Sequence, residues 1–196
     1  MKPNVLVFYG SYRPDRLGIR LANYVVKHLR TQGAESELID AKAVGLPILE
    51  CMYKEYPAGQ APSAMEELAA KIRAADAFVF VTGEYNHGVQ PGLKNLTDHF
   101  LEEWFWRPVG IASYSAGRSA GISSAFAWHP VLSEMGMVVI SSVVSVGPIE
   151  AALDENGQTI GDSGKALDDR FPRFAQDLFW WAEAAKNQHA LKQPPY

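Results

Sequence analysis

Four runs of residues along the chain are almost continuously apolar, and a fifth, shorter run is only weakly so. The four lie at 5–9, 77–82, 109–114 and 137–146, and the weak run lies at 36–39. Strands that are apolar throughout, rather than at alternate positions, are typical of a parallel sheet buried on both faces. The pattern therefore predicts five β-strands, most of them closed by a glycine or a polar loop.

The intervals between these runs show the spacing of amphipathic helices. Ser63 stands three residues before Glu66, a capping-box pattern that predicts a helix start, and Pro91 suits the first turn of another helix. The segment 40–62 has no clear period and is interpreted as a surface excursion with room for one short helical turn. Helices are expected at about 19–29, 63–75, 91–104, within 117–135 and at 165–187.

The alternation of strands and helices predicts the fold class. We expect an α/β fold of the flavodoxin-like kind, a three-layer sandwich with helices on both faces of a five-stranded parallel sheet of order 2-1-3-4-5. In such sheets the ligand lies beyond the carboxyl ends of the strands, where the strand order reverses. The loops after Tyr9, Thr82 and Tyr114 are therefore the candidate site. We expect residues 1–189 to form one domain and 190–196 a loose tail.

Composition and charge narrow the classes of function. With 196 residues, 47% of them hydrophobic and 20% charged, the chain can build one sizeable core. The 18 Lys and Arg against 22 Asp and Glu give a net charge of −4, which disfavours a nucleic-acid partner but leaves a small basic site open. Cys51 is the only cysteine, which excludes an intrachain disulfide. No apolar stretch approaches the length of a membrane span, so we expect a cytoplasmic protein without a membrane partner.

The loop after the first strand, at 10–18, carries groups suited to a phosphate. It leads into a helix, whose first N–H groups and positive dipole end favour an anion. Ser11 adds a hydroxyl, and Arg13 and Arg16 add guanidinium groups. The alternative is that Ser11 only caps the helix and that the arginines are solvated or paired with Asp15. The loop lacks both the P-loop pattern of NTPases and the G-x-G-x-x-G pattern of dinucleotide-binding folds.

The loop after the third strand offers a surface for a planar ligand. Glu84, Tyr85, Asn86 and His87 follow the strand in succession, which is more than a turn requires. Nearby glycines would let a ligand approach the backbone closely. The alternative is a half-buried tyrosine, a turn asparagine and a surface histidine without a ligand. His87 and His99 lack a spacing typical of metal ligands, so we predict no metal site.

Together these segments resemble the NADPH-dependent FMN reductase family. The matching segments are Gly10-Ser11-x-Arg13-x-x-Arg16-x-Gly18, Glu84-Tyr85-Asn86-His87, Pro91-Gly92-Leu93-Lys94-Asn95, Asp98-His99, Glu103-Trp104, Arg107-Pro108-Val109-Gly110 and Ser113-Tyr114-Ser115-Ala116-Gly117-Arg118. The likeness extends over residues 4–146 in the right order. Two departures are Gly83, where the family frequently has Pro, and Ser115-Ala116 in place of a more glycine-rich stretch. The first is expected to alter loop stiffness and the second to narrow the acceptor pocket.

The resemblance implies an FMN-binding domain at 1–189. The residues that it assigns to the FMN phosphate are Ser11, Arg13, Arg16, Leu17 and Gly18. Those that it assigns to the isoalloxazine ring are Glu84, Tyr85, Asn86 and His87 on one side and Ser115 and Gly117 on the other. It also implies a homodimer or homotetramer with the flavin near a subunit boundary.

The implied reaction is hydride transfer in two steps. NADPH or NADH reduces bound FMN, and the reducing equivalents then pass to a small-molecule electron acceptor such as a quinone, an azo compound, a flavin or a metal oxyanion. Because the cofactor carries this chemistry, no catalytic side chain is assigned.

Two other functions remain open from the sequence. A flavodoxin-type electron carrier would bind FMN without NAD(P)H reductase activity, but such carriers usually have a strongly acidic surface. A serine hydrolase is the second, because Gly117-Arg118-Ser119-Ala120-Gly121 matches G-x-S-x-G and acidic residues and His189 follow in the expected order. Several residues separate the strand end at Tyr114 from Ser119, which argues against the tight turn that such a nucleophile needs.

Overall fold

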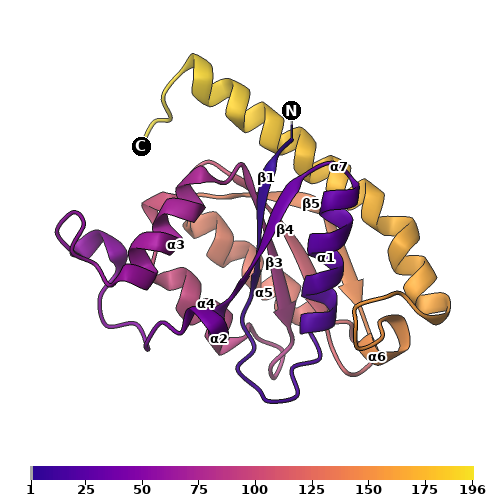
Figure 1. Ribbon diagram of the computed structural model, residues 1–196. Helices are drawn as coiled ribbons and strands as arrows, with labels where there is room; N and C mark the ends of the chain where they lie inside the picture. The colour runs from indigo at the N-terminus through magenta and orange to yellow at the C-terminus, as the bar shows by residue number, and fades with distance from the viewer. Residues whose placement is uncertain (1) are drawn as a thin grey trace.

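The computed structural model describes residues 2–196 and shows a five-stranded parallel sheet between two layers of helices (Figure 1). The strands are β1 Asn4–Tyr9, β2 Glu35–Asp40, β3 Ala77–Gly83, β4 Pro108–Tyr114 and β5 Val138–Val146. The helices are α1 Ile19–Thr31, α2 Ala41–Val44, α3 Ser63–Ala74, α4 Pro91–Asp98, α5 Ile122–Glu134, α6 Ile149–Ala152 and α7 Gly161–Leu191, with single turns η1 Tyr53–Glu55 and η2 Glu102–Trp104.

The strand order is β2-β1-β3-β4-β5, which confirms the predicted flavodoxin-like topology. Every neighbouring pair is parallel. Tyr9 of β1 lies beside Val81 of β3, and Thr82 of β3 lies beside Ser113 of β4. The three central strands therefore end at the same edge of the sheet, and their loops meet at the lower end of the molecule in Figure 1.

Successive side chains of each strand point into separate cores on the two faces of the sheet. Val5, Val7 and Tyr9 of β1 pack with α1 and α7, whereas Leu6 and Phe8 pack with α3, α4 and α5. All five side chains are buried. Burial on both faces explains why this strand is apolar at every position.

An aromatic side chain ends α4 earlier than predicted. The Trp104 ring lies edge-on to the Phe8 ring, with 5.2 Å between centroids, in the core beneath α3 and α4. Its indole N–H donates to the carbonyl oxygens of Thr97 and Phe100. These bonds satisfy carbonyls at the end of the helix. Helix α4 therefore ends at Asp98, and the prediction of a helix continuing to residue 104 is wrong.

Two other details of the helices also differ from prediction. The prediction of a capping box at Ser63 is wrong, because the N-cap residue is Pro62, which has no side-chain acceptor. Glu66 instead accepts hydrogen bonds from the Ala61 N–H and the Tyr53 hydroxyl. The excursion at 40–62 contains two short helical elements, α2 and η1, where one was expected.

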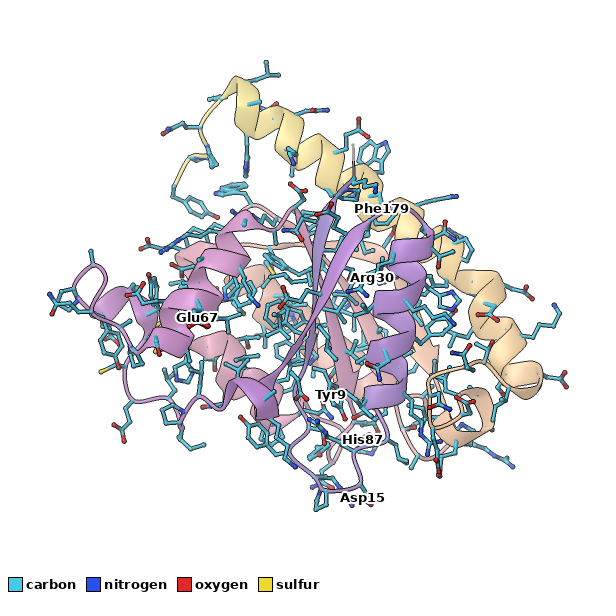
Figure 2. All side chains as sticks on the ribbon, in the orientation of Figure 1. Tyr9, Asp15, Arg30, Glu67, His87 and Phe179 are labelled. Atoms are coloured by element: carbon cyan, nitrogen blue, oxygen red, sulfur yellow. The ribbon has the colours of Figure 1, made fainter. Side chains whose placement is uncertain are left out.

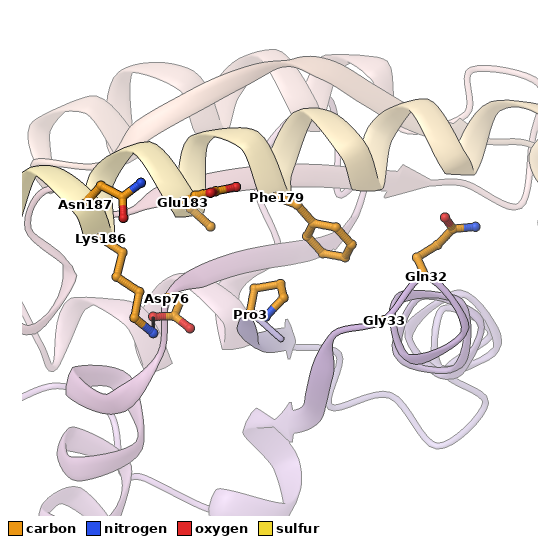
Figure 3. Close-up of a pocket in the computed structure, with 9 residues that line it drawn as sticks. Pro3, Gln32, Gly33, Asp76, Phe179, Glu183, Lys186 and Asn187 are labelled. Atoms are coloured by element: carbon orange, nitrogen blue, oxygen red, sulfur yellow. Dashed lines mark hydrogen bonds and ion pairs between the residues drawn. The ribbon is translucent and has the colours of Figure 1, made fainter. Parts of the chain in front are cut away.

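Helix α7 is tied to the amino ends of β1 and β3 around a cavity shown in Figure 3. Lys186 donates to Asp76 at 2.8 Å, and Asp76 also accepts from the Asn4 N–H. Phe179 lines the same cavity. These contacts pack the helix against the sheet, and the helix continues past the predicted end at 187 to Leu191. The cavity lies at the opposite edge of the sheet from the three candidate loops.

Protonation of His28 is expected to lower stability in mildly acidic solution. Its imidazole stacks on the Tyr24 ring, with 3.9 Å between centroids. Burial lowers the pKa of His28 below its ordinary value of 6.5, an effect that Asp168 opposes and Lys27 reinforces. Because the pKa is lower in the folded than in the unfolded state, the neutral ring contributes its full stability above pH 6.5 and loses it as the pH falls toward the folded pKa.

Urea unfolding at a series of pH values measures this contribution. Below pH 6.5 the free energy of unfolding should fall more steeply for the wild type than for His28→Phe, which keeps a stacking ring that does not titrate. Equal slopes for the two proteins would contradict the role given to His28.

Candidate functional site

The three loops at the carboxyl edge of the sheet line one cavity. Figure 2 shows Tyr9, Asp15 and His87 at this end of the molecule. The lining residues are Ser11, Arg13, Asp15, Arg16 and Leu17 from the first loop, Gly83, Glu84 and Tyr85 from the second, and Tyr114, Ser115 and Ala116 from the third. The topology therefore brings together segments that are far apart in the sequence.

Seven of the predicted site residues line this cavity, and the other four adjoin it along the chain. The seven are Ser11, Arg13, Arg16, Leu17, Glu84, Tyr85 and Ser115. The four neighbours are Gly18, Asn86, His87 and Gly117. No ligand-binding role was predicted for Asp15, Gly83 or Tyr114, whereas Ala116 lies in the stretch that was expected to narrow the acceptor pocket. Tyr114 could have been identified from the sequence, because it is the last residue of a buried strand at the edge where the loops meet.

The backbone N–H groups of the first loop are available to a ligand. Within the described residues, none of the N–H groups at 11–18 donates to a protein acceptor. The loop leads into the N-terminus of α1, where the helix dipole is positive. Ser11 is only 2% exposed, and its hydroxyl lies 3.2 Å from the Tyr85 hydroxyl. Free donors at a helix N-terminus suit a phosphate group.

Both arginines of this loop form ion pairs with carboxylates. Arg16 Nη1 donates to Asp40 at 2.7 Å, and this contact raises the pKa of Arg16, which stays charged. The Arg16 side chain is 23% exposed, so its position beside the cavity is fixed by Asp40. Arg13 lies 3.6 Å from Asp15, and both side chains are largely exposed. Pairing with Asp15, the alternative weighed from the sequence, therefore applies to Arg13 and not to Arg16.

The second loop is a tight hairpin turn. Tyr85 N–H donates to the Gly88 carbonyl at 3.2 Å, and Gly88 N–H donates back to the Tyr85 carbonyl at 2.9 Å. Asn86 and His87 between them have φ of 51° and 62°. Two left-handed residues at the corners define the type I′ turn, which asparagine tolerates better than histidine does. A strained corner beside a cavity is the kind of feature that accompanies a binding site.

Glu84 connects the second loop to α5. Its side chain is 10% exposed, and the carboxylate accepts from the Ser123 N–H at 3.2 Å. Ser123 is the second residue of α5, where a negative charge stabilises the helix. The same carboxylate lies 3.3 Å from His87 Nδ1. Glu84 therefore has a structural role in fixing the hairpin, in addition to lining the cavity.

Glu84→Ala is expected to lower the free energy of unfolding by about 0.5–2 kcal/mol, the usual cost of losing a helix cap. Urea denaturation measures the loss. Glu67→Ala removes an exposed glutamate of α3, far from the cavity (Figure 2), and serves as the matched control with almost no change. Equal stability of the two variants would contradict the capping role.

The structure separates the residues of the hydrolase hypothesis. Ser119 Oγ donates to Ser115 Oγ at 3.1 Å, in the third loop. His189 lines a cavity with Trp106 and Val138, which lie at the amino ends of β4 and β5. Ser119 and His189 are thus at opposite edges of the sheet and form no catalytic triad, so the serine hydrolase interpretation is wrong.

Two searches of the described residues bear on other classes of site. Among residues 2–196, no three His, Cys, Asp or Glu side chains are grouped so that they could hold a metal ion. Of the helices described, none has both the length and the apolar character required to cross a membrane.

Known proteins resemble this chain in sequence and in fold. A family model described as NADPH-dependent FMN reductase matches residues 3–151. The NAD(P)H-dependent FMN reductase LOT6 of Saccharomyces cerevisiae is 30% identical over 156 residues, covering 73% of this chain and 80% of that protein. A quinone reductase of Pseudomonas putida is 28% identical over 178 residues, covering 88% and 89% of the two chains. The structure of FerB, a flavoenzyme NAD(P)H:(acceptor) oxidoreductase from Paracoccus denitrificans, has a TM-score of 0.74 with 21% identity, covering 93% of this chain and 98% of that one.

These matches decide between the two flavin-dependent functions that the sequence left open. The family model covers all three loops of the cavity, and the family takes its name from a reductase activity rather than from electron carriage. The chain belongs to the NADPH-dependent FMN reductase family and is an FMN-dependent NAD(P)H oxidoreductase.

Proposed function

We propose that the cavity binds FMN with its phosphate on the first loop and its isoalloxazine ring between the second and third loops. The observation that carries this proposal is the set of free N–H groups at 11–18, next to the N-terminus of α1. A phosphate would bond donors that no protein group uses. Ser11 would add its hydroxyl and Arg16 a fixed positive charge.

The chain's own contribution is to hold and orient the cofactor. FMN supplies the redox chemistry, which is acceptance of a hydride from NADPH or NADH and delivery of electrons to an acceptor. The hairpin at Asn86 and His87, whose two corner residues are left-handed, would present backbone groups to the edge of the ring. Ser115 of the third loop lines the cavity opposite the hairpin and would close the other side of the ring. No side chain is required as an acid or base.

Quinones are the class of acceptor that we propose. A quinone is a flat molecule that can stack on the isoalloxazine ring, and a quinone reductase is among the relatives. Azo compounds, flavins and metal oxyanions are the competing acceptors, and a direct comparison ranks them.

Steady-state oxidation of NADPH and NADH by the FMN-loaded protein tests this function. We expect turnover that needs both FMN and added benzoquinone, and a larger kcat/KM for the quinone than for an azo dye, free FMN or chromate. Quinone turnover no faster than that of the other acceptors would contradict the quinone proposal. Absence of turnover with every acceptor would contradict the reductase function.

We also propose that the protein is a homodimer, or a homotetramer of such dimers, and acts in the cytoplasm. Ile122 and Phe126 on α5 are 47% and 69% exposed, close to the contact between Ser123 and His87. Exposed apolar residues beside a site are typical of an interface. Light scattering is expected to give a multiple of the chain mass for the wild type and a smaller mass for Phe126→Ser. A single-chain mass for the wild type would contradict the dimer.

A further inference from the structure

A buried set of polar side chains connects the first and second loops beneath the cavity. Tyr114 lies at its centre, at the end of β4, and is 8% exposed. Its hydroxyl accepts from Gln90 Nε2 at 2.8 Å and donates to the Tyr9 hydroxyl at 3.5 Å. The Tyr9 hydroxyl donates to the Arg16 carbonyl at 3.4 Å. The bonds therefore run from the start of α4, through β4 and β1, to the first loop.

The Tyr114 ring also occupies space that two glycines leave open. A Cβ added at Gly18, in the first loop, would lie 2.0 Å from Tyr114 Cζ. A Cβ added at Gly83, where the second loop begins, would lie 2.7 Å from the same atom. The ring is thus in contact with the backbone of both loops, and no side chain larger than hydrogen fits at either position while the ring stays in place.

The ring is not free to move aside. Its hydroxyl is the acceptor for Gln90, which is fully buried, and within the described residues Gln90 Oε1 has no hydrogen-bond partner. A displaced phenol would leave a buried amide with neither end bonded, which is costly. Burial raises the pKa of Tyr114 far above its ordinary value, so the hydroxyl stays protonated and keeps both bonds over the neutral range.

We infer that Tyr114 is a positioning residue for FMN, which sets the spacing between the loop that holds the phosphate and the loop that faces the ring. The inference rests on the proposed FMN site. It also explains Gly83, where the family resemblance leads one to expect Pro, because ring atoms at residue 83 would collide with Tyr114. The absence of a side chain at Gly18 and at Gly83 leaves the space that the Tyr114 ring occupies.

A size-exchange experiment tests the inference. Flavin fluorescence gives the FMN dissociation constant of the wild type, Gly18→Ala, Tyr114→Leu and the double variant. Gly18→Ala should weaken FMN binding at least about tenfold in the wild-type background, where buried hydrogen bonds resist displacement of the ring. It should weaken binding by less than about twofold in the Tyr114→Leu background, where the space is free. An equal loss in both backgrounds would overturn the inference.

Tyr114→Phe distinguishes positioning from a purely structural role. This variant keeps the ring and loses the hydroxyl, and we expect FMN to bind about tenfold more weakly with an altered visible spectrum of the bound flavin. The matched control is Tyr24→Phe, which removes another buried hydroxyl, bonded to Asp168 at 2.8 Å. The control should lower the thermal midpoint of the apoprotein and leave both flavin readouts unchanged.

If Tyr114→Phe changes only the thermal midpoint, as its control does, Tyr114 is structural and the inference fails. A wild-type protein that bound no FMN would overturn the proposed function itself, and the inference with it, at the first titration. The two failures are therefore distinguishable.

Discussion

Replacing Gly10 by alanine is expected to abolish FMN binding and to destabilise the fold strongly. Gly10 begins the first loop, and a Cβ there would lie 2.2 Å from Leu93 N and 2.3 Å from Leu93 Cα. These are backbone atoms of α4, so no side-chain rotation relieves the collision. Gly92 of the same helix is equally close, since a Cβ added there would lie 2.4 Å from the Gly10 carbonyl oxygen. The loop and the helix must separate, at a cost on the order of 3 kcal/mol or more.

Chemical denaturation and FMN titration measure the two effects of Gly10→Ala. Gly117→Ala is the control for folding, because an added Cβ at Gly117 meets no atom within 4 Å. Its unfolding midpoint should match that of the wild type. Wild-type stability of Gly10→Ala would show that the loop and α4 are not packed as described.

Arg16→Gln is expected to weaken FMN binding by about 10- to 100-fold and to leave riboflavin binding almost unchanged. The guanidinium lies beside the cavity, held by Asp40 at 2.7 Å. A hydrogen bond to a charged group contributes about 1.5–3 kcal/mol, and riboflavin has no phosphate to receive it. The variant also leaves the Asp40 carboxylate without its arginine, beside the proposed phosphate site, which is expected to add repulsion for FMN alone.

Parallel titrations with the two flavins test this selectivity. The matched control is Arg30→Gln, which removes an arginine at the other end of α1 that donates to the Ser36 carbonyl. It should bind both flavins as the wild type does. Equal losses of FMN and riboflavin affinity in Arg16→Gln would assign Arg16 to the loop's structure rather than to the phosphate.

The architecture was largely predictable because its strands are buried on both faces. Val5 to Tyr9 and Ala77 to Val81 are apolar at every position, and such runs are visible without knowing any neighbouring strand. The edge of the sheet that carries the site followed from the topology alone. The helix end at Asp98 was not predictable in this way, because it depends on hydrogen bonds from the Trp104 indole, which a hydrophobic period does not reveal.

The interior of the candidate site depends on register, which sequence patterns do not give. Asp40 holds Arg16 because β1 and β2 pair with Tyr9 beside Asp40. Tyr114 lies between Gly18 and the second loop because β4 pairs with β3 at its last residue. Motif matching found the loops that surround the cavity but not the side chains that fix their spacing.

The most direct test of the central claim is the visible absorption spectrum of the purified protein after FMN addition, desalting and anaerobic mixing with NADPH or NADH. We expect the yellow colour to stay with the protein and to bleach rapidly with at least one nicotinamide. Retained colour that neither nicotinamide bleaches would contradict the reductase function and favour an electron carrier. Loss of all flavin on desalting, confirmed by a titration without binding, would contradict the FMN site itself.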